Sequence, residues 1–255
     1  MNGEAIADAA RLRHQMGAGA GVGYALAYGS HAHDTAGTAS DLDLLFVGDQ
    51  TLTAPALHAL VTAVKSLHHR HGLAADEEVC YKSKLYATGP DVSAATALGG
   101  FDASEQGQLT ATPVVVEPWW LNSRPFRLRL ILNALTTPHV FLGGDLPAYR
   151  RHTQDAETAV ALLALALVGR SRFGLADAVA VLLDGPDGAT GEDWLGYRPG
   201  PHLASLLHRG MAALAEHGIV RFPDGTHLEQ DPELRRRAVV QLRRRANAAG
   251  AKSGF

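Results

Sequence analysis

Two short apolar stretches that lie close together along the chain constrain its fold more than any other feature. The first, YALAYG at residues 24–29, and the second, DLDLLFVG at 41–48, each have the length and composition of a buried strand ending at a glycine. Strand side chains alternate between two faces, so Asp41 and Asp43 share one face while the leucine between them points the other way. Two carboxylates about 7 Å apart repel each other unless a positive charge lies near both. This acid pair is therefore either a solvated strand edge or part of a cation site.

Helical patterns flank the two strands. Residues 4–16 have the composition of a short helix, and the glycines that follow, at 17, 19, 21 and 23, are expected to end it. Residues 53–71 form a stronger helical pattern, with Thr53 as the N-cap and Pro55 in the first turn. The remaining elements expected before residue 150 are a strand at 76–88, a loop with one irregular helix at 89–112, a strand at 113–120, a helix at 124–135 and a short strand at 139–145.

The pattern changes near residue 150. Four helical stretches follow, and no strand pattern interrupts them. We therefore expect an α/β (α+β) fold with two domains. Residues 1–150 would hold a small mixed sheet with helices on one side, and residues 151–255 would form an all-helical C-terminal domain.

Composition limits which partners and which cellular compartment we expect for the protein. The formal net charge of −3 gives no general attraction to nucleic acid or to an anionic membrane. A single cysteine, Cys80, excludes an intramolecular disulfide, and the N-terminus lacks a signal-peptide pattern, so we expect a cytoplasmic protein. The most apolar run, residues 159–169, is too short to span a bilayer.

The stretch that contains the acid pair resembles a known signature. Residues 29–43 resemble the motif of the polymerase-beta-like nucleotidyltransferase superfamily, in its small bacterial form GS-x-A-R-G-x-A-x-x-x-S-D-h-D. His33 and Asp34 depart from it, where the motif has Arg and Gly. The matching positions are Gly29, Ser30, Ala32, Ala36, Ser40, Asp41 and Asp43.

The resemblance implies a fold, a cofactor and a set of roles. Asp41 and Asp43 would be catalytic ligands of Mg²⁺, in a two-metal site, because Mg²⁺ prefers oxygen ligands. A third carboxylate is expected on the following strand, where alternation favours Glu78 as a metal ligand or general base. Asp76 and Glu117 remain alternatives for this third carboxylate.

The nucleotide-binding residues follow from the same motif and from the next strand. Gly29 would let the backbone approach a triphosphate, and Ser30 would open a helix whose positive end favours phosphate. Ser40 belongs to the same segment. Lys84 continues the face of Glu78, so it either reaches phosphate or is simply solvated.

The expected reaction is transfer of a nucleoside monophosphate, AMP from ATP or another nucleoside triphosphate, to a hydroxyl of a small molecule. The arrangement with a large helical domain is similar to the antibiotic-modifying nucleotidyltransferases. We expect a monomer or homodimer that binds neither a membrane nor a nucleic acid. The alternatives are a protein or tRNA acceptor, as in the modifying antitoxins, and a non-catalytic regulator that binds nucleotide.

Two further clusters have ordinary structural interpretations. His68, His69 and His71 are expected to be favourable cations at the end of helix 53–71, because they lack the spacing and the partners of a zinc site. The basic run at 235–245 is expected to be a solvated or partner-facing helix surface.

Overall fold

A mixed four-stranded sheet forms the N-terminal part of the protein, with strand order β3-β2-β1-β6. The computed structural model describes residues 3–29, 42–74, 84–104, 107–111, 123–185, 197–224 and 227–250. β1 pairs antiparallel with β2 and β6, and β2 pairs parallel with β3, so the expected mixed sheet is confirmed. The strands are β1 (Val22–Tyr28), β2 (Asp43–Gly48), β3 (Tyr86–Thr88) and β6 (Val140–Gly144).

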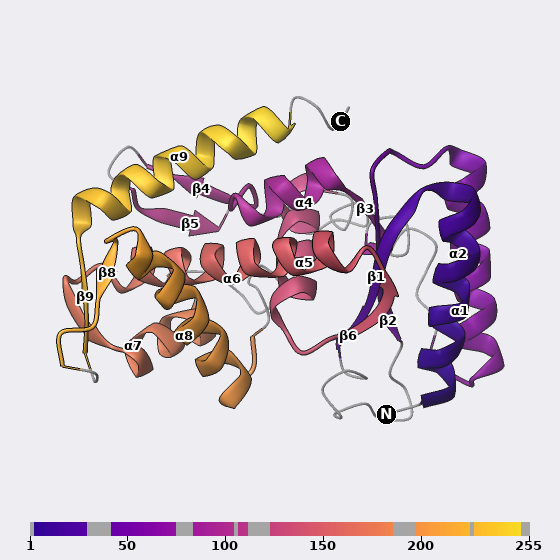
Figure 1. Ribbon diagram of the computed structural model, residues 1–255, viewed down its shortest axis with the longest axis horizontal. Coiled ribbons are helices and arrows are strands. Elements are labelled where there is room, and N and C mark those ends of the chain that lie inside the picture. The colour runs from indigo at the N-terminus through magenta and orange to yellow at the C-terminus, as the bar shows by residue number, and fades with distance from the viewer. Residues whose placement is uncertain are drawn as a thin grey trace.

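Helices cover both faces of this sheet (Figure 1). Ala25 and Phe46 point to the face covered by α1 (Gly3–Ala20) and α2 (Ala54–Arg70). Leu26 and Leu45 point to the opposite face, which is covered by helices from later in the chain. The expectation of helices on one side is therefore wrong, because the central strands are apolar on both faces and must be buried on both.

The first helix is longer than its glycines suggested. α1 continues through residues 17 and 19 and ends before Gly21, which has a φ of +67°. Nη2 of Arg13 donates to the carbonyl oxygens of Val22 and Gly23, at 3.2 and 2.6 Å. These bonds tie the helix to the start of β1. A glycine weakens a helix but ends it only where the backbone becomes left-handed, so the predicted end was too early.

The second helix agrees with its sequence pattern. The side chain of Thr53 accepts a hydrogen bond from the amide of Ala56, which confirms the predicted N-cap. The buried face of α2 packs against the sheet and consists of Leu60, Val61, Val64, Leu67 and His68.

The segment predicted as a loop at 89–112 is more regular than expected. Thr88 and Asp91 form a capping box at the start of α4 (Gly89–Thr96). An antiparallel hairpin follows, made of β4 (Phe101–Ala103) and β5 (Leu109–Ala111). Strands of three residues are too short to show alternation, which explains why the sequence did not indicate them. The predicted strand at 113–120 lies outside the described residues.

Within the described residues, the C-terminal part contains four helices, as expected, together with a small sheet that the sequence did not predict. This three-stranded sheet has the order β7-β9-β8, so the expectation of an all-helical C-terminal domain is wrong. Residue 150 lies inside α6, so secondary structure is continuous across the predicted domain boundary. The elements from residue 124 onward, besides β6, are α5 (Arg124–Thr136), α6 (Leu146–Val168), β7 (Arg172–Gly174), α7 (Leu175–Asp184), α8 (Pro201–Glu216), β8 (Val220–Arg221), β9 (His227–Gln230) and α9 (Pro232–Gly250).

One long helix connects the two parts. α6 contacts α5, α7 and α8, and Tyr24 of β1 lies 2.9 Å, hydroxyl to Nδ1, from His152 of α6. α9 extends across this part of the molecule and packs on α4 (Figure 1). Among the described residues, no helix is both long enough and apolar enough to cross a membrane.

A mostly buried histidine beside β6 is hydrogen-bonded at both ring nitrogens. Nδ1 of His139 lies 2.7 Å from the carbonyl oxygen of Thr137, and Nε2 lies 2.8 Å from the hydroxyl of Tyr149. A carbonyl oxygen can only accept, so Nδ1 carries the proton and the Tyr149 hydroxyl donates to Nε2. Burial lowers the pKa of His139 below its ordinary value of 6.5. Burial also lowers the pKa of His152, on α6.

We expect the protein to lose stability as the pH falls below about 6.5. In the folded state these imidazoles have lowered pKa values, so the unfolded chain binds protons first and acid favours unfolding. Urea unfolding followed between about pH 7.5 and 5.5 measures the effect. A His139→Gln variant should show a shallower decline, and an identical decline in both proteins would contradict the role of His139.

Candidate functional site

The candidate site begins where β1 ends beside the start of β2. Tyr28 pairs with Asp43 in the antiparallel register, and Gly29 follows with a φ of +75°. A Cβ added to Gly29 would lie 2.2 Å from Oδ2 of Asp43 and 3.1 Å from its Cγ. The Asp43 carboxylate therefore packs directly on the main chain of Gly29. Both the backbone conformation and this close approach require glycine at the position.

Lys84 completes the described part of the site; it lies in a helical turn just before β3, because the strand expected at 76–88 is present, among the described residues, only at 86–88. Nζ of Lys84 lies 2.7 Å from Oδ1 of Asp43, and the two side chains are only 18% and 20% exposed. The parallel pairing of β2 with β3 brings them together, because the amide of Phe46 donates to the carbonyl oxygen of Leu85 at 2.8 Å. Lys84 is therefore an ion-pair partner of Asp43, and the alternative of a solvated lysine is wrong.

A buried histidine of α2 is hydrogen-bonded to the backbone just before β2, the strand that carries Asp43. The side chain of His68, on α2, is fully buried, and its Nε2 lies 3.1 Å from the carbonyl oxygen of Leu42. That oxygen can only accept, so Nε2 donates and holds the backbone immediately before Asp43. His68 is therefore a buried side chain that packs on the sheet, which its expected role at the helix end did not include. Its position four residues after the buried Val64 was the available signal, because residues four apart share a helix face.

Replacing His68 by Leu should lower the free energy of unfolding by about 1–3 kcal/mol, because a buried carbonyl oxygen loses its donor. Urea unfolding at neutral pH measures this loss. The neighbouring His69 is exposed, and its replacement by Ala is the matched control, expected to change stability by no more than about 0.5 kcal/mol. Equal effects of the two substitutions would contradict the role assigned to His68.

Asp43 is the only predicted metal ligand among the residues that the structure describes. Asp41 and Glu78 lie outside them, together with Ser30, Ser40 and the alternative carboxylates Asp76 and Glu117. Within the described ranges, no group of three or more His, Cys, Asp or Glu side chains is arranged to hold a metal ion. The carboxylate of Asp43 has the chemistry of one ligand for a divalent cation. It is partly shielded from water, and its Oδ1 already forms an ion pair with the ammonium of Lys84.

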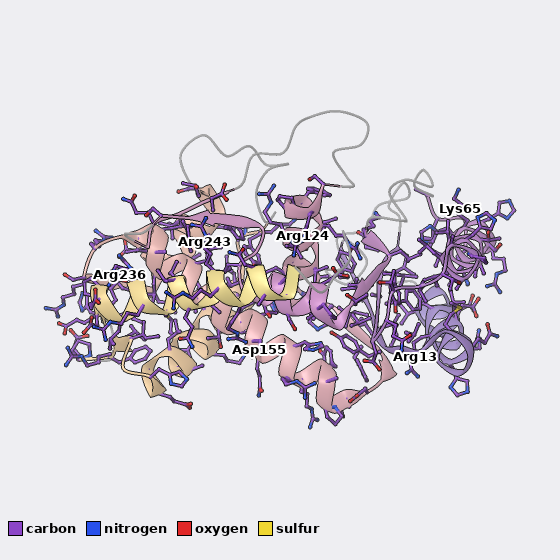
Figure 2. All side chains as sticks on the ribbon, turned by 90° about the horizontal axis from the view of Figure 1, so that it is seen from above. Arg13, Lys65, Arg124, Asp155, Arg236 and Arg243 are labelled. Carbon is purple, nitrogen blue, oxygen red and sulfur yellow. The ribbon has the colours of Figure 1, made fainter. Side chains whose placement is uncertain are left out.

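A groove elsewhere in the molecule does not include these residues. Its volume is about 620 Å³, and polar and apolar residues of α4, α6, α8 and α9 line it. Charged residues at its edges include Asp155 of α6 and Arg237 of α9. Figure 2 shows that Arg243 of α9 extends toward β4, on the side of the helix away from Asp155, and it does not line the groove. Among the described residues, no lining residue of this groove belongs to the Gly29–Asp43–Lys84 cluster.

No family model, no curated protein and no solved structure matches this chain.

Proposed function

We propose that this protein is a Mg²⁺-dependent nucleotidyltransferase that transfers a nucleoside monophosphate, AMP from ATP, to a hydroxyl of a small molecule. The observation that carries the proposal is the contact between Gly29 and Asp43. The glycine of the Gly-Ser pair and the second aspartate of the acid pair are distant in sequence, yet the β1–β2 register places them against each other. An accidental acid pair on a solvated strand edge would not require a glycine with a φ of +75° beneath one of its carboxylates.

Two other features support the proposal. The carboxylate of Asp43 already binds one cation, Lys84, in a site that is partly shielded from water. β2 lies in the middle of the sheet, and His68 fixes its beginning, so Asp43 is rigidly placed. Rigid placement matters because phosphoryl-group chemistry depends mainly on positioning and charge neutralisation.

The residues would divide the work as follows. Asp43, with Asp41, would hold the cation, and Gly29 and Ser30 would hold the triphosphate. When bound, Mg²⁺ would neutralise phosphate charge and favour loss of pyrophosphate. The acceptor oxygen forms a bond to the α-phosphorus while the bond from that phosphorus to the bridging oxygen breaks. Pyrophosphate leaves with the electron pair, and Glu78 takes the proton of the acceptor hydroxyl.

The test combines binding with product detection. Thermal unfolding is compared for ATP with Mg²⁺, for ATP with EDTA, and for the other three nucleoside triphosphates with Mg²⁺. α-Labelled nucleotide is then incubated with the protein, Mg²⁺ and a panel of small molecules rich in hydroxyl and amino groups. We expect a shift in unfolding temperature that depends on Mg²⁺ and a labelled acceptor.

Three other results would each reject this function. No shift with any nucleotide would reject the transferase proposal altogether. A shift without any labelled product would favour a non-catalytic nucleotide-binding protein. Label found only on protein or tRNA from a cell extract would replace the small-molecule acceptor.

A further inference from the structure

We propose that Lys84 occupies the cation-binding oxygen of Asp43 until a nucleotide arrives, which makes metal binding at this site depend on the triphosphate. The inference rests on the proposed function and adds an order of binding to it. Lys84 would act as a resident counter-cation: its ammonium neutralises Asp43 in the free protein and moves to the triphosphate when nucleotide and metal bind.

The ammonium of Lys84 and a bound metal ion would compete for the same oxygen, Oδ1 of Asp43. Nζ of Lys84 lies 2.7 Å from Oδ1 of Asp43, while Oδ2 faces the main chain of Gly29. Mg²⁺ binds carboxylate oxygens at about 2.0–2.1 Å, so an ion on Oδ1 and the ammonium would be no more than about 5 Å apart. Both side chains are about four-fifths buried, and charges so placed are weakly screened by solvent. The two cations therefore disfavour each other at Asp43.

The ammonium of Lys84 can move without displacement of its backbone. The backbone at Lys84 is anchored by the hydrogen bond between Phe46 and Leu85, whereas its ammonium is carried on a flexible four-carbon chain. Rotation of that chain moves the charge by several ångström while β3 stays in place. A triphosphate arriving at the end of β1, beside Gly29, would offer the ammonium several anionic oxygens.

The Asp43 carboxylate needs a positive partner when no metal ion is bound. A carboxylate that is mostly buried is unfavourable unless it is paired with a positive charge. Lys84 supplies that charge whenever no metal is present. When a triphosphate and a divalent cation bind together, both side chains keep an oppositely charged partner: Asp43 pairs with the metal ion and Lys84 with phosphate. Binding of the two ligands is then cooperative, and by linkage each must strengthen the other equally.

The experiment measures binding of Mn²⁺, as a spectroscopic substitute for Mg²⁺, to the whole protein without turnover. Wild type, Lys84→Met and Lys84→Arg are titrated by electron paramagnetic resonance, with and without a non-hydrolysable ATP analogue. Without nucleotide, we expect Lys84→Met to bind Mn²⁺ at least about tenfold more tightly than wild type, and Lys84→Arg to resemble wild type. The analogue should strengthen Mn²⁺ binding to wild type by about tenfold or more, and to Lys84→Met by clearly less.

Three results would overturn the inference. The first is that Lys84→Met binds Mn²⁺ no more tightly than wild type, and the second is that the analogue strengthens binding to both proteins equally. The double variant Asp43→Asn, Lys84→Met should lose the gained affinity, and its retention would place the ion elsewhere and also overturn the inference. Thermal unfolding checks the fold, and Lys84→Gln takes the place of Lys84→Met if the latter does not unfold cooperatively.

The failures of the two proposals differ. If wild type binds Mn²⁺ with nucleotide and forms product, but Lys84→Met shows no gain, the function holds and the role of Lys84 fails. If no protein binds nucleotide with Mn²⁺ and no product forms, the proposed function itself fails.

Discussion

Replacing Asp43 by Asn should reduce nucleotidyl transfer by about 1,000-fold or more, while the protein remains folded. Asn has nearly the same shape and can still pack on Gly29, but it lacks the charge that holds a cation and pairs with Lys84. Charge stabilisation of several kcal/mol by a bound metal corresponds to a rate effect of this size. The measurement is the initial rate of labelled-product formation at saturating nucleotide, with thermal unfolding to confirm the fold.

Asp49 provides the matched control for this substitution. It follows β2 by one residue, is exposed and lies apart from the described cluster. Asp49→Asn removes the same charge from the same strand region and should leave the rate within about twofold, as is usual for exposed sites. If Asp43→Asn retains wild-type activity, Asp43 is not part of the reaction centre.

Replacing Gly29 by Ala should remove most activity and destabilise the fold. The new methyl group would lie 2.2 Å from Oδ2 of Asp43, so the carboxylate must move. The φ of +75° adds a penalty of about 1–2 kcal/mol for any residue with a Cβ. We expect a loss of roughly 2–3 kcal/mol in unfolding free energy and a rate reduction of at least about 100-fold, since small misplacements at a reaction centre are costly.

Gly72 separates the two effects. It has a similar φ of +63°, but a Cβ added there meets no atom within 4 Å. Gly72→Ala should therefore cost only the backbone penalty of about 1–2 kcal/mol and leave activity unchanged. Should Gly29→Ala and Gly72→Ala lose the same stability and keep the same activity, the contact with Asp43 would have no functional importance.

Local patterns predicted much of the fold. α2 could be located because Thr53 caps it and its apolar residues repeat at helical spacing. The strands at 22–28 and 43–48 were visible as compact apolar runs that end at glycines. The close approach of Gly29 and Asp43 was not predicted, because it depends on the β1–β2 register.

Features that depend on tertiary structure could not be predicted in the same way. The pairing of Lys84 with Asp43 spans 41 residues and requires the parallel register of β2 with β3. His68 looked like its exposed neighbour His69 because only the composition of the helix end was considered, although its spacing from Val64 placed it on the buried face. β7, β8 and β9 contain two to four residues each, which is too few for a periodic signal.

Because α6 is continuous across residue 150, the N-terminal and C-terminal parts of this protein are difficult to exchange separately. The helix begins directly after β6, and its buried residues join Leu26 of β1 and Leu207 of α8 in one apolar core. A fragment that ends near residue 150 would cut this helix in its first turns and expose the face of the sheet that it covers. The two parts are therefore poor candidates for exchange with those of other proteins. Point substitution within the shared core is the more accessible route to altered specificity.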